Sequence, residues 1–187
     1  MLHTISKFKL VFTLCLLMTV VHVLNSLLGM GLNQFGILPR HIETIWAIYT
    51  APFLHASIYH LLNNLVGLGI FSLLYLVHSI QRYVYSSFLI ITITGLLVWL
   101  FGRDAVHIGA SGWVFGLWSL CIATAWYERR MRNILIALFV IVFYGGLIFG
   151  VLPSDPRISF ESHFFGVIAG ICCSYINSRG TTLTRRH

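Results

Sequence analysis

Long apolar runs separated by short polar stretches dominate the pattern along the chain. The runs cover residues 10–28, 58–77, 83–101, 111–127, 134–152 and 162–176. A helix needs about 20 predominantly apolar residues to cross a bilayer, and each run reaches or nearly reaches that length. The pattern therefore predicts an all-α polytopic membrane protein, a bundle of six transmembrane helices that forms a single membrane domain over residues 1–187.

The first run and the stretch after it have competing interpretations. A secretory signal peptide is the alternative for residues 10–28, but the run is long for a signal peptide and no small-x-small cleavage site follows it. We therefore expect a spanning helix. Residues 29–57 mix glycine, proline and charged residues with Trp46 and Tyr49. This stretch is too broken to span and too apolar for a free loop, which favours a loop that lies in the membrane interface, anchored by aromatic rings.

Composition agrees with a membrane protein, and charge suggests its orientation. Only 9% of the residues are charged, whereas soluble domains carry about 25%. With both termini in the cytoplasm, nine of the twelve Lys and Arg fall in inner segments, as the positive-inside rule requires. The net charge of +7 then reflects the inner face rather than nucleic-acid binding. The inner residues are Lys7, Lys9, Arg82, Arg129, Arg130, Arg132, Arg179, Arg185 and Arg186; the outer ones are Arg40, Arg103 and Arg157.

Cysteine and histidine spacing indicates neither a disulfide framework nor a metal site. His55 and His60 are five residues apart, a spacing that does not suit one helix face, and no HExxH motif is present. We therefore expect no bound metal. The four cysteines lie inside apolar runs without CxxC spacing, which is typical of core or lipid-facing thiols: Cys15, Cys121, Cys172 and Cys173.

Polar residues gather at the outer end of the predicted bundle. The second helix begins with His60 and Asn64, which share a face because they are spaced i,i+4. The fourth begins with Ser111 and the sixth with His163. Counted from the charges at the inner face, Ser111 and His163 each lie about 25 Å along a helix, against a hydrocarbon core of about 30 Å. We expect both groups several ångströms below the outer surface, facing the bundle interior or a water-filled cavity.

A serine and a histidine at matched depth fit acyl-transfer chemistry. A serine hydroxyl is a poor nucleophile until a neighbouring imidazole accepts its proton, which gives Ser111 and His163 the roles of nucleophile and general base. The developing oxyanion needs fixed donors, and the His60 ring, the Asn64 amide and the Ser111 backbone N–H suit that role. We expect a dyad, because three acidic residues nearby are not clearly placed as a third member: Asp104, Asp155 and Glu161.

Glycine motifs explain how the serine and histidine helices would meet. Gly112-x-x-x-Gly116 and Gly166-x-x-x-Gly170 are small-xxx-small faces that let two backbones approach closely. Close packing would bring the nucleophile and the base within hydrogen-bond reach, and Phe115 is placed to stack under the histidine ring. Each signal alone is commonly a packing feature. Their joint occurrence at one depth favours catalysis.

These residues resemble the motifs of the rhomboid family of intramembrane serine proteases. The match consists of His60-x-x-x-Asn64, Gly109-x-Ser111-Gly112 and His163-x-x-Gly166-x-x-x-Gly170, in that order. The resemblance implies a six-helix bundle with Ser111 as nucleophile, His163 as general base, and His60 and Asn64 stabilising the oxyanion, without metal or cofactor. It also implies that His55 is a further histidine near the active site.

The resemblance implies partners as well. Family members cut transmembrane or juxtamembrane segments of other membrane proteins, so the expected partners are such substrates and the lipid bilayer, and not nucleic acid. The bare six-helix form and short tails favour a prokaryotic plasma membrane, and the topology drawn from the charges predicts that the active site opens to the outer face. Two positions depart from the family pattern: Ala47 rather than arginine follows Trp46, and Phe115 stands where tyrosine is frequent. The alternatives are a processing protease for sorting-signal proteins and a non-catalytic rhomboid-like protein that binds membrane helices.

Overall fold

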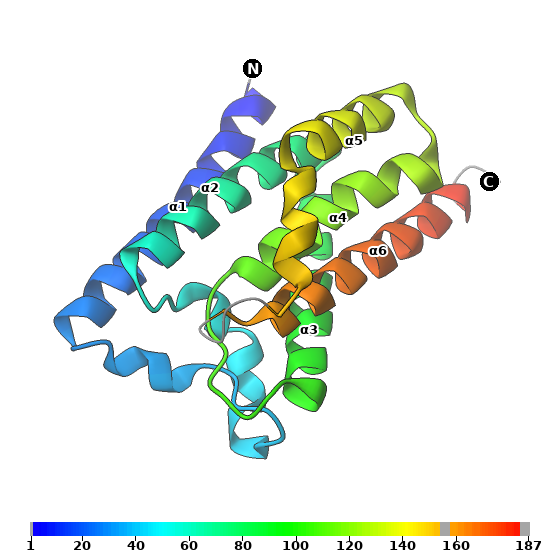
Figure 1. Ribbon diagram of the computed structural model, residues 1–187. Coiled ribbons are helices and arrows are strands. Elements are labelled where there is room, and N and C mark those ends of the chain that lie inside the picture. Colours follow the sequence, from blue (N-terminus) through cyan, green and yellow to red (C-terminus); the bar gives the residue numbers. More distant parts are fainter. Residues whose placement is uncertain (1, 154–157, 184–187) are drawn as a thin grey trace.

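The computed structural model describes residues 2–153 and 158–183 and is built from helices (Figure 1). This arrangement confirms the all-α fold class. The six α-helices are α1 (Leu2–Leu27), α2 (Ile58–Tyr75), α3 (Ile80–Phe101), α4 (Ser111–Glu128), α5 (Met131–Tyr144) and α6 (Phe160–Leu183). Four short 3-10 helices are η1 (Gly31–Phe35), η2 (Ile42–Ile48), η3 (Ala51–Phe53) and η4 (Gly145–Val151).

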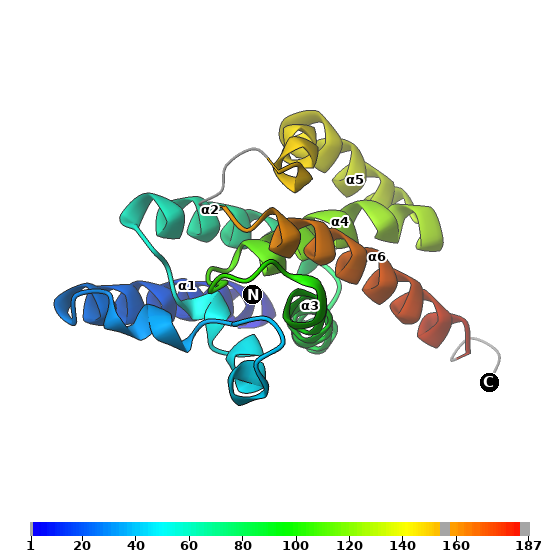
Figure 2. The same ribbon diagram turned by 60° about the horizontal axis from the view of Figure 1, so that its bottom comes forward.

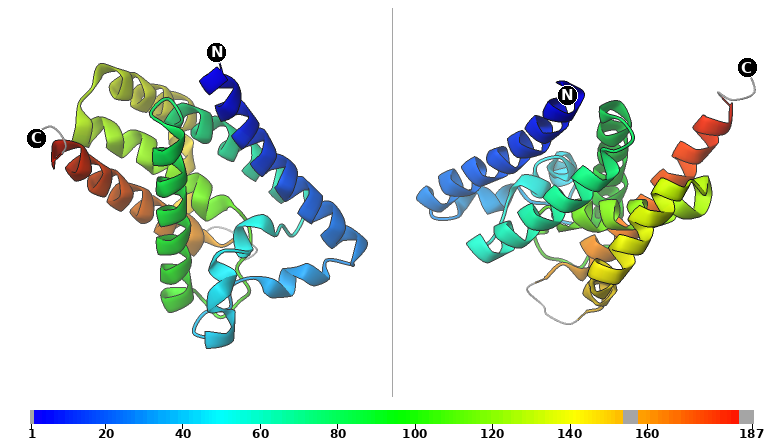
Figure 3. Two further views of the ribbon diagram at one scale, coloured as in Figure 1. Left: turned by 180° about the vertical axis from the view of Figure 1, so that it is seen from behind. Right: turned by 90° about the horizontal axis from the view of Figure 1, so that it is seen from above.

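Helix α4 lies at the centre of the bundle, among four of the other α-helices. It contacts α2, α3, α5 and α6, and all residues from Ser111 to Cys121 are buried. By contrast, α1 and α5 expose large apolar side chains over most of their length. Figure 3 shows α5 and α1 on the periphery from two further directions. Ser111, the first residue of α4, is therefore buried inside the bundle.

Within residues 2–153 and 158–183, four segments are long and apolar enough to cross a membrane: Ile5–Leu27, Ile58–Tyr75, Ile80–Phe101 and Met131–Val151. The chain is therefore an integral membrane protein. Helices α4 and α6 do not meet that measure. For α4 the physical reason is its central position, since a helix covered by protein does not need a lipid-compatible surface. The count of six spans and the cytoplasmic termini stay predictions. Asp155, an acidic residue weighed as a triad member, lies outside the described residues. So do three arginines of the charge count: Arg157, Arg185 and Arg186.

The helix boundaries differ from the apolar runs in two places. Helix α1 begins at Leu2 rather than at residue 10, because the lead contains no glycine or proline that would interrupt the helix. The expected span over residues 134–152 agrees with the apolar helical segment Met131–Val151, but the helix type changes within it, because α5 ends at Tyr144 and η4 continues to Val151. The change occurs at Gly145 and Gly146, where glycine lowers the propensity for α-helix.

The segment between α1 and α2 packs against the loop that joins α3 to α4. Ile37 and His107 form an isolated antiparallel bridge, with backbone N–O distances of 3.0 and 2.8 Å. Arg40 donates a side-chain hydrogen bond to the Gly102 carbonyl at 2.7 Å. Figure 2 brings this end of the bundle forward. The expected interfacial segment therefore has defined 3-10 structure and supports the loop that leads into α4.

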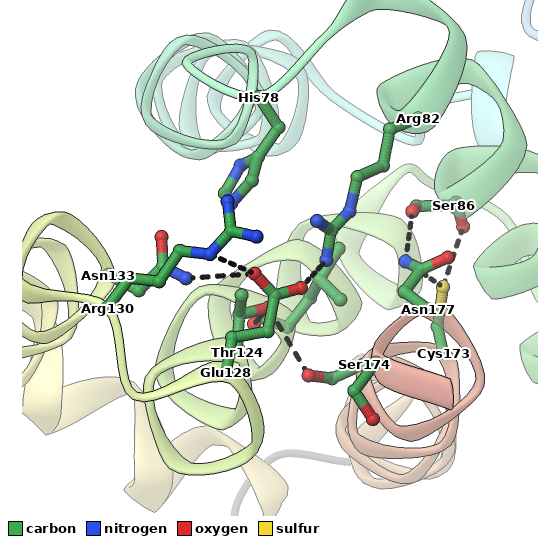
Figure 4. Close-up of polar contacts among 12 residues, drawn as sticks. His78, Arg82, Ser86, Thr124, Glu128, Arg130, Asn133, Cys173, Ser174 and Asn177 are labelled. Carbon is green, nitrogen blue, oxygen red and sulfur yellow. Dashed lines mark hydrogen bonds and ion pairs between the residues drawn. The ribbon is translucent and has the colours of Figure 1, made fainter. Parts of the chain in front are cut away.

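A buried polar network ties five helices together at the opposite end (Figure 4). Glu128, at the end of α4, forms an ion pair with Arg82 of α3 and accepts a hydrogen bond from Asn133 of α5 at 3.2 Å. Arg82 also donates to the Tyr75 hydroxyl at 2.9 Å, and Asn177 of α6 donates to the same hydroxyl at 3.1 Å. A buried charge needs such partners because its desolvation is costly.

Candidate active site

The ring of His163 has a defined orientation. The residue lies in the first turn of α6 and is 9% exposed. Its imidazole stacks on Phe115, with ring centroids 4.1 Å apart and planes 7° apart, as the sequence suggested. On its edge, Nδ1 lies 2.8 Å from the carbonyl oxygen of Gly150 in η4. Two contacts from two different helices therefore fix the ring plane and its rotation.

The Gly150 contact decides which ring nitrogen can act as a base. A carbonyl oxygen carries no hydrogen, so Nδ1 of His163 must donate. In the neutral imidazole, Nε2 then has no proton and presents its lone pair. A general base needs this tautomer. The backbone of η4 thus supplies the orienting contact that a carboxylate supplies in a three-residue triad.

Ser111 opens α4 beside the two polar residues of α2. It is 9% exposed and follows Gly109, whose φ of 110° is rarely adopted by other residues. A Cβ atom on Gly109 would lie 2.5 Å from Nε2 of His60 and 3.5 Å from Nδ2 of Asn64. The structure therefore brings His60, Asn64 and the backbone just before Ser111 into contact. Glycine is required here for its conformation and for the close approach.

Glycine faces bring α4 and α6 into backbone contact, as predicted. A Cβ atom on Gly166 would collide with the carbonyl oxygen of Gly112, and one on Gly170 would collide with that of Gly116. Near the start of α4, a Cβ on Gly112 would lie 3.1 Å from the Ser162 carbonyl oxygen. Ser162 immediately precedes His163, so the backbones that carry the nucleophile and the base candidates pass each other closely.

The described part of the chain includes no hydrogen bond between the Ser111 hydroxyl and the His163 ring. Catalytic hydrogen bonds are often long or poorly aligned without substrate and tighten in the substrate complex. The dyad contact stays a prediction. What the structure gives is the serine at the start of α4, an oriented imidazole on α6, and two side chains of α2 near the same turn.

His55 lies beneath the donor candidate His60. Its ring is fully buried just before α2 and meets the His60 ring edge-on, with centroids 5.0 Å apart. Burial, together with the neighbouring His60, lowers the pKa of His55 to about 3. The ring is therefore neutral at physiological pH. It contacts the His60 ring, and its role near the active site stays a prediction.

A family model for the rhomboid domain matches residues 43–180. This match covers well over half of the chain. The chain belongs to the rhomboid family.

Relatives of this rhomboid chain include mycobacterial proteins. An uncharacterized protein of Mycobacterium tuberculosis, Rv1337, is 30% identical over 177 residues, which cover 90% of this chain and 74% of the relative. An uncharacterized protein of Mycobacterium leprae, ML1171, is 28% identical over 184 residues, which cover 94% of this chain and 73% of the relative. Their names state no activity, so these similarities give no information about the function of this chain.

Two features of this rhomboid site were not found in the sequence. The Gly150 carbonyl is a backbone group, and residue type gives no sign of it, although the glycine itself is needed because a Cβ would lie 2.7 Å from Cζ of Phe115. The second feature is Glu161, which was considered only as a triad member. Its carboxylate is directed to Arg103 of the α3–α4 loop, at 3.5 Å.

Proposed function

We propose that this protein is an intramembrane serine endopeptidase that cleaves transmembrane or juxtamembrane segments of other membrane proteins. The observation that carries the proposal is the tautomer of His163, whose Nδ1 donates to the Gly150 carbonyl and leaves Nε2 as the proton acceptor. A histidine that served only to fill space would not need both this contact and the flat stacking on Phe115. Membership of a family of intramembrane proteases supports the same conclusion.

The reaction follows from the roles of the two residues. Ser111 Oγ attacks the carbonyl carbon of the scissile peptide bond while His163 Nε2 takes the hydroxyl proton. The tetrahedral intermediate then collapses as His163 returns that proton to the leaving amine. Water from the outer side hydrolyses the acyl-enzyme, with His163 again as the base. The Gly150 carbonyl keeps the proton on Nδ1 and stabilises the imidazolium that forms.

Oxyanion stabilisation is assigned to the α2 side chains and the start of α4. Asn64 is 5% exposed and its Nδ2 has no hydrogen-bond partner in the described part of the chain. Its amide N–H is therefore available to donate to the oxyanion. His60 lies beside it across Gly109. The Ser111 backbone N–H at the helix start is a third donor. Removing one such donor costs about 2.7–4 kcal/mol of transition-state stabilisation where it has been measured in a serine protease.

The substrate must present an extended backbone, because a helix shields its carbonyl groups in its own hydrogen bonds. We expect a substrate helix to enter laterally between α2 and α5 and to unwind near the outer surface, in a plasma membrane. Helix α5 suits such a border, because only Asn133, Ala137 and Val140 are buried along it.

The second candidate is a rhomboid-like protein that binds membrane helices without cleaving them. Such a protein needs the bundle and its lipid-facing surfaces but has no use for an oriented base. The ordered His163 ring therefore favours the protease. The two functions differ in one direct observable, which is whether Ser111 reacts.

The test is cleavage of a labile single-span substrate by the full-length protein in liposomes, with labelling by a fluorophosphonate probe alongside. We expect Ser111→Ala and His163→Ala to lose cleavage by on the order of 10³-fold or more, and to lose labelling. Ser26→Ala removes an exposed serine of α1 and serves as the matched control, with unchanged activity. Cleavage by Ser111→Ala at the parent rate would overturn the assignment. Substrate binding without cleavage or labelling by the parent would favour the binder.

A further inference from the structure

The short segment that precedes His163 is bonded to the loop that precedes Ser111. Residues 158–162 run into the first turn of α6, and residues 102–110 connect α3 to α4. The contacts between them are polar and come from side chains on both segments. Since each segment leads within a few residues to one member of the proposed dyad, these contacts bear on how the two members are aligned.

Glu161 and Arg103 form the first set of contacts. The Glu161 side chain is 8% exposed, and its Oε1 lies 3.5 Å from Nε of Arg103 and accepts from the Arg103 backbone N–H at 3.4 Å. The other end of the guanidinium donates to the Ile158 carbonyl at 2.7 Å. One arginine therefore holds the α6 start at two points. The second carboxylate oxygen, Oε2, is buried without a partner in the described residues, so Arg103 is the main compensation for the buried charge.

His107 forms the second set of contacts. Its Nε2 lies 3.1 Å from the Arg103 carbonyl oxygen and must donate, which leaves Nδ1 as an acceptor. The Ser159 hydroxyl, 2.7 Å away, donates to Nδ1, and the Ser162 hydroxyl donates to Ser159 Oγ at 2.7 Å. Burial, the largest influence, lowers the pKa of His107, so the ring is neutral and the direction of these bonds is fixed.

These contacts restrain the sliding and rotation of α6 along α4, which the glycine faces of the two helices do not. Two smooth backbone faces set the distance between helices but resist sliding and rotation weakly. Directional hydrogen bonds and an ion pair at the outer end set the height and rotation of the first turn of α6. His163 is two residues beyond Glu161, and Ser111 is four residues beyond His107. A helix turn is stiff over that distance, so fixing Glu161 fixes the height and rotation of the backbone that carries the histidine ring.

We propose that Glu161 and Arg103 are positioning residues, which hold the first turn of α6 against the α3–α4 loop and thereby align His163 with Ser111. The proposal rests on the proposed protease function. It assigns neither residue to the chemistry, because neither would touch the substrate. It differs from a purely structural ion pair in its consequence, since misalignment of the dyad changes turnover without changing substrate binding.

The test measures kcat and KM separately in liposomes for Glu161→Gln, Arg103→Gln and the double variant, together with the rate of fluorophosphonate labelling. Misplacement of a reacting group by about 1 Å can cost on the order of 100-fold in rate. We expect each single variant to lose at least about tenfold in kcat, with KM within about twofold and labelling slowed in proportion. The double variant should lose no more than Arg103→Gln alone, because Arg103→Gln already removes the ion pair together with the contact to the Ile158 carbonyl.

Glu43→Gln is the matched control, since Glu43 is an exposed acid of the outer segment that pairs with His41. It should retain kcat and KM. If Glu161→Gln fails to fold, Arg103→Lys keeps the charge on a partly exposed side chain and should still lose several-fold in kcat. Retention of kcat within twofold by folded Glu161→Gln, with the parent active, would overturn the positioning role alone. A folded parent that neither cleaves nor labels would overturn the protease function, and the positioning role with it.

Discussion

Nδ1 of His163 lies 2.8 Å from the carbonyl oxygen of Gly150. The contact joins α6 to η4, the 3-10 continuation of α5, so the tautomer of the base candidate depends on where η4 lies. A Cβ atom on Gly150 would lie only 2.7 Å from Cζ of Phe115, the ring on which the imidazole stacks. The geometry of the base is therefore a property of three helical elements and not of α6 alone.

Gly150→Ala tests this dependence. The new Cβ would lie 2.7 Å from Cζ of Phe115 and 3.6 Å from Nδ1 of His163, so η4 has to move away and the carbonyl moves with it. We expect kcat for a single-span substrate to fall by about tenfold or more, since a 1 Å displacement at a catalytic group is costly. Gly146→Ala is the control, because nothing lies within 4 Å of the Cβ position there. Equal turnover of the two variants would contradict the role of the Gly150 carbonyl.

Gly166→Ala tests the close contact between α4 and α6. Its Cβ would collide with the Gly112 carbonyl oxygen, a backbone atom that can move only with its helix. Overpacking of this kind typically costs about 1–3 kcal/mol, and occasionally more. Denaturant titration in detergent micelles would measure the loss in free energy of unfolding. In contrast, Gly69→Ala in α2, with open space at its Cβ, should gain about 0.5–1 kcal/mol. A stable Gly166→Ala variant would show that the two helices are not in close contact.

The ion pair between Arg82 and Glu128 predicts an asymmetric response to mutation. Arg82→Met leaves the buried carboxylate of Glu128 without its main partner, and breaking a buried pair in this way costs about 3–5 kcal/mol. The double variant Arg82→Met with Glu128→Leu removes both charges and should recover most of the loss. Unfolding in detergent checks both values. If Arg82→Met is as stable as the parent, the ion pair behaves like an exposed surface pair, which contributes about 0–1 kcal/mol.

The candidate site residues could be selected from the sequence because their residue types are unusual for their surroundings. Ser111, His60, Asn64 and His163 are polar groups at the ends of apolar runs, and the cost of burying them implies a purpose. The glycine faces were predicted for the same kind of reason, since only a small residue permits backbone contact. In both cases the side chain itself carries the information.

The supporting contacts could not be predicted, because they depend on tertiary geometry. The group of Gly150 that contacts His163 is a backbone carbonyl, which every residue has. Arg103 and Glu161 are 58 positions apart in the sequence. The break between α5 and η4 was also missed, since the apolar pattern continues through Gly145 and Gly146. Hydrophobic periodicity locates a helix in the membrane but does not distinguish an α-helix from a 3-10 turn of the same polarity.

His55 predicts a loss of stability in acid. Burial holds its pKa at about 3 in the folded protein, whereas an exposed histidine titrates near 6.5. As pH falls below 6.5, His55 therefore gains a proton in the unfolded chain but stays neutral in the folded chain. The contribution of His55 is complete above that value, is reduced by about 2 kcal/mol at pH 5, and declines further toward pH 3.

The free energy of unfolding measured in micelles between pH 7.5 and 5 would check this prediction. His55→Gln removes the titrating ring and should flatten the slope by about 2 kcal/mol across that range. His41→Gln is the matched control, because His41 is exposed in the segment between α1 and α2. It should leave the slope close to that of the parent. A His55→Gln variant that keeps the full acid sensitivity would mean that other buried groups carry it.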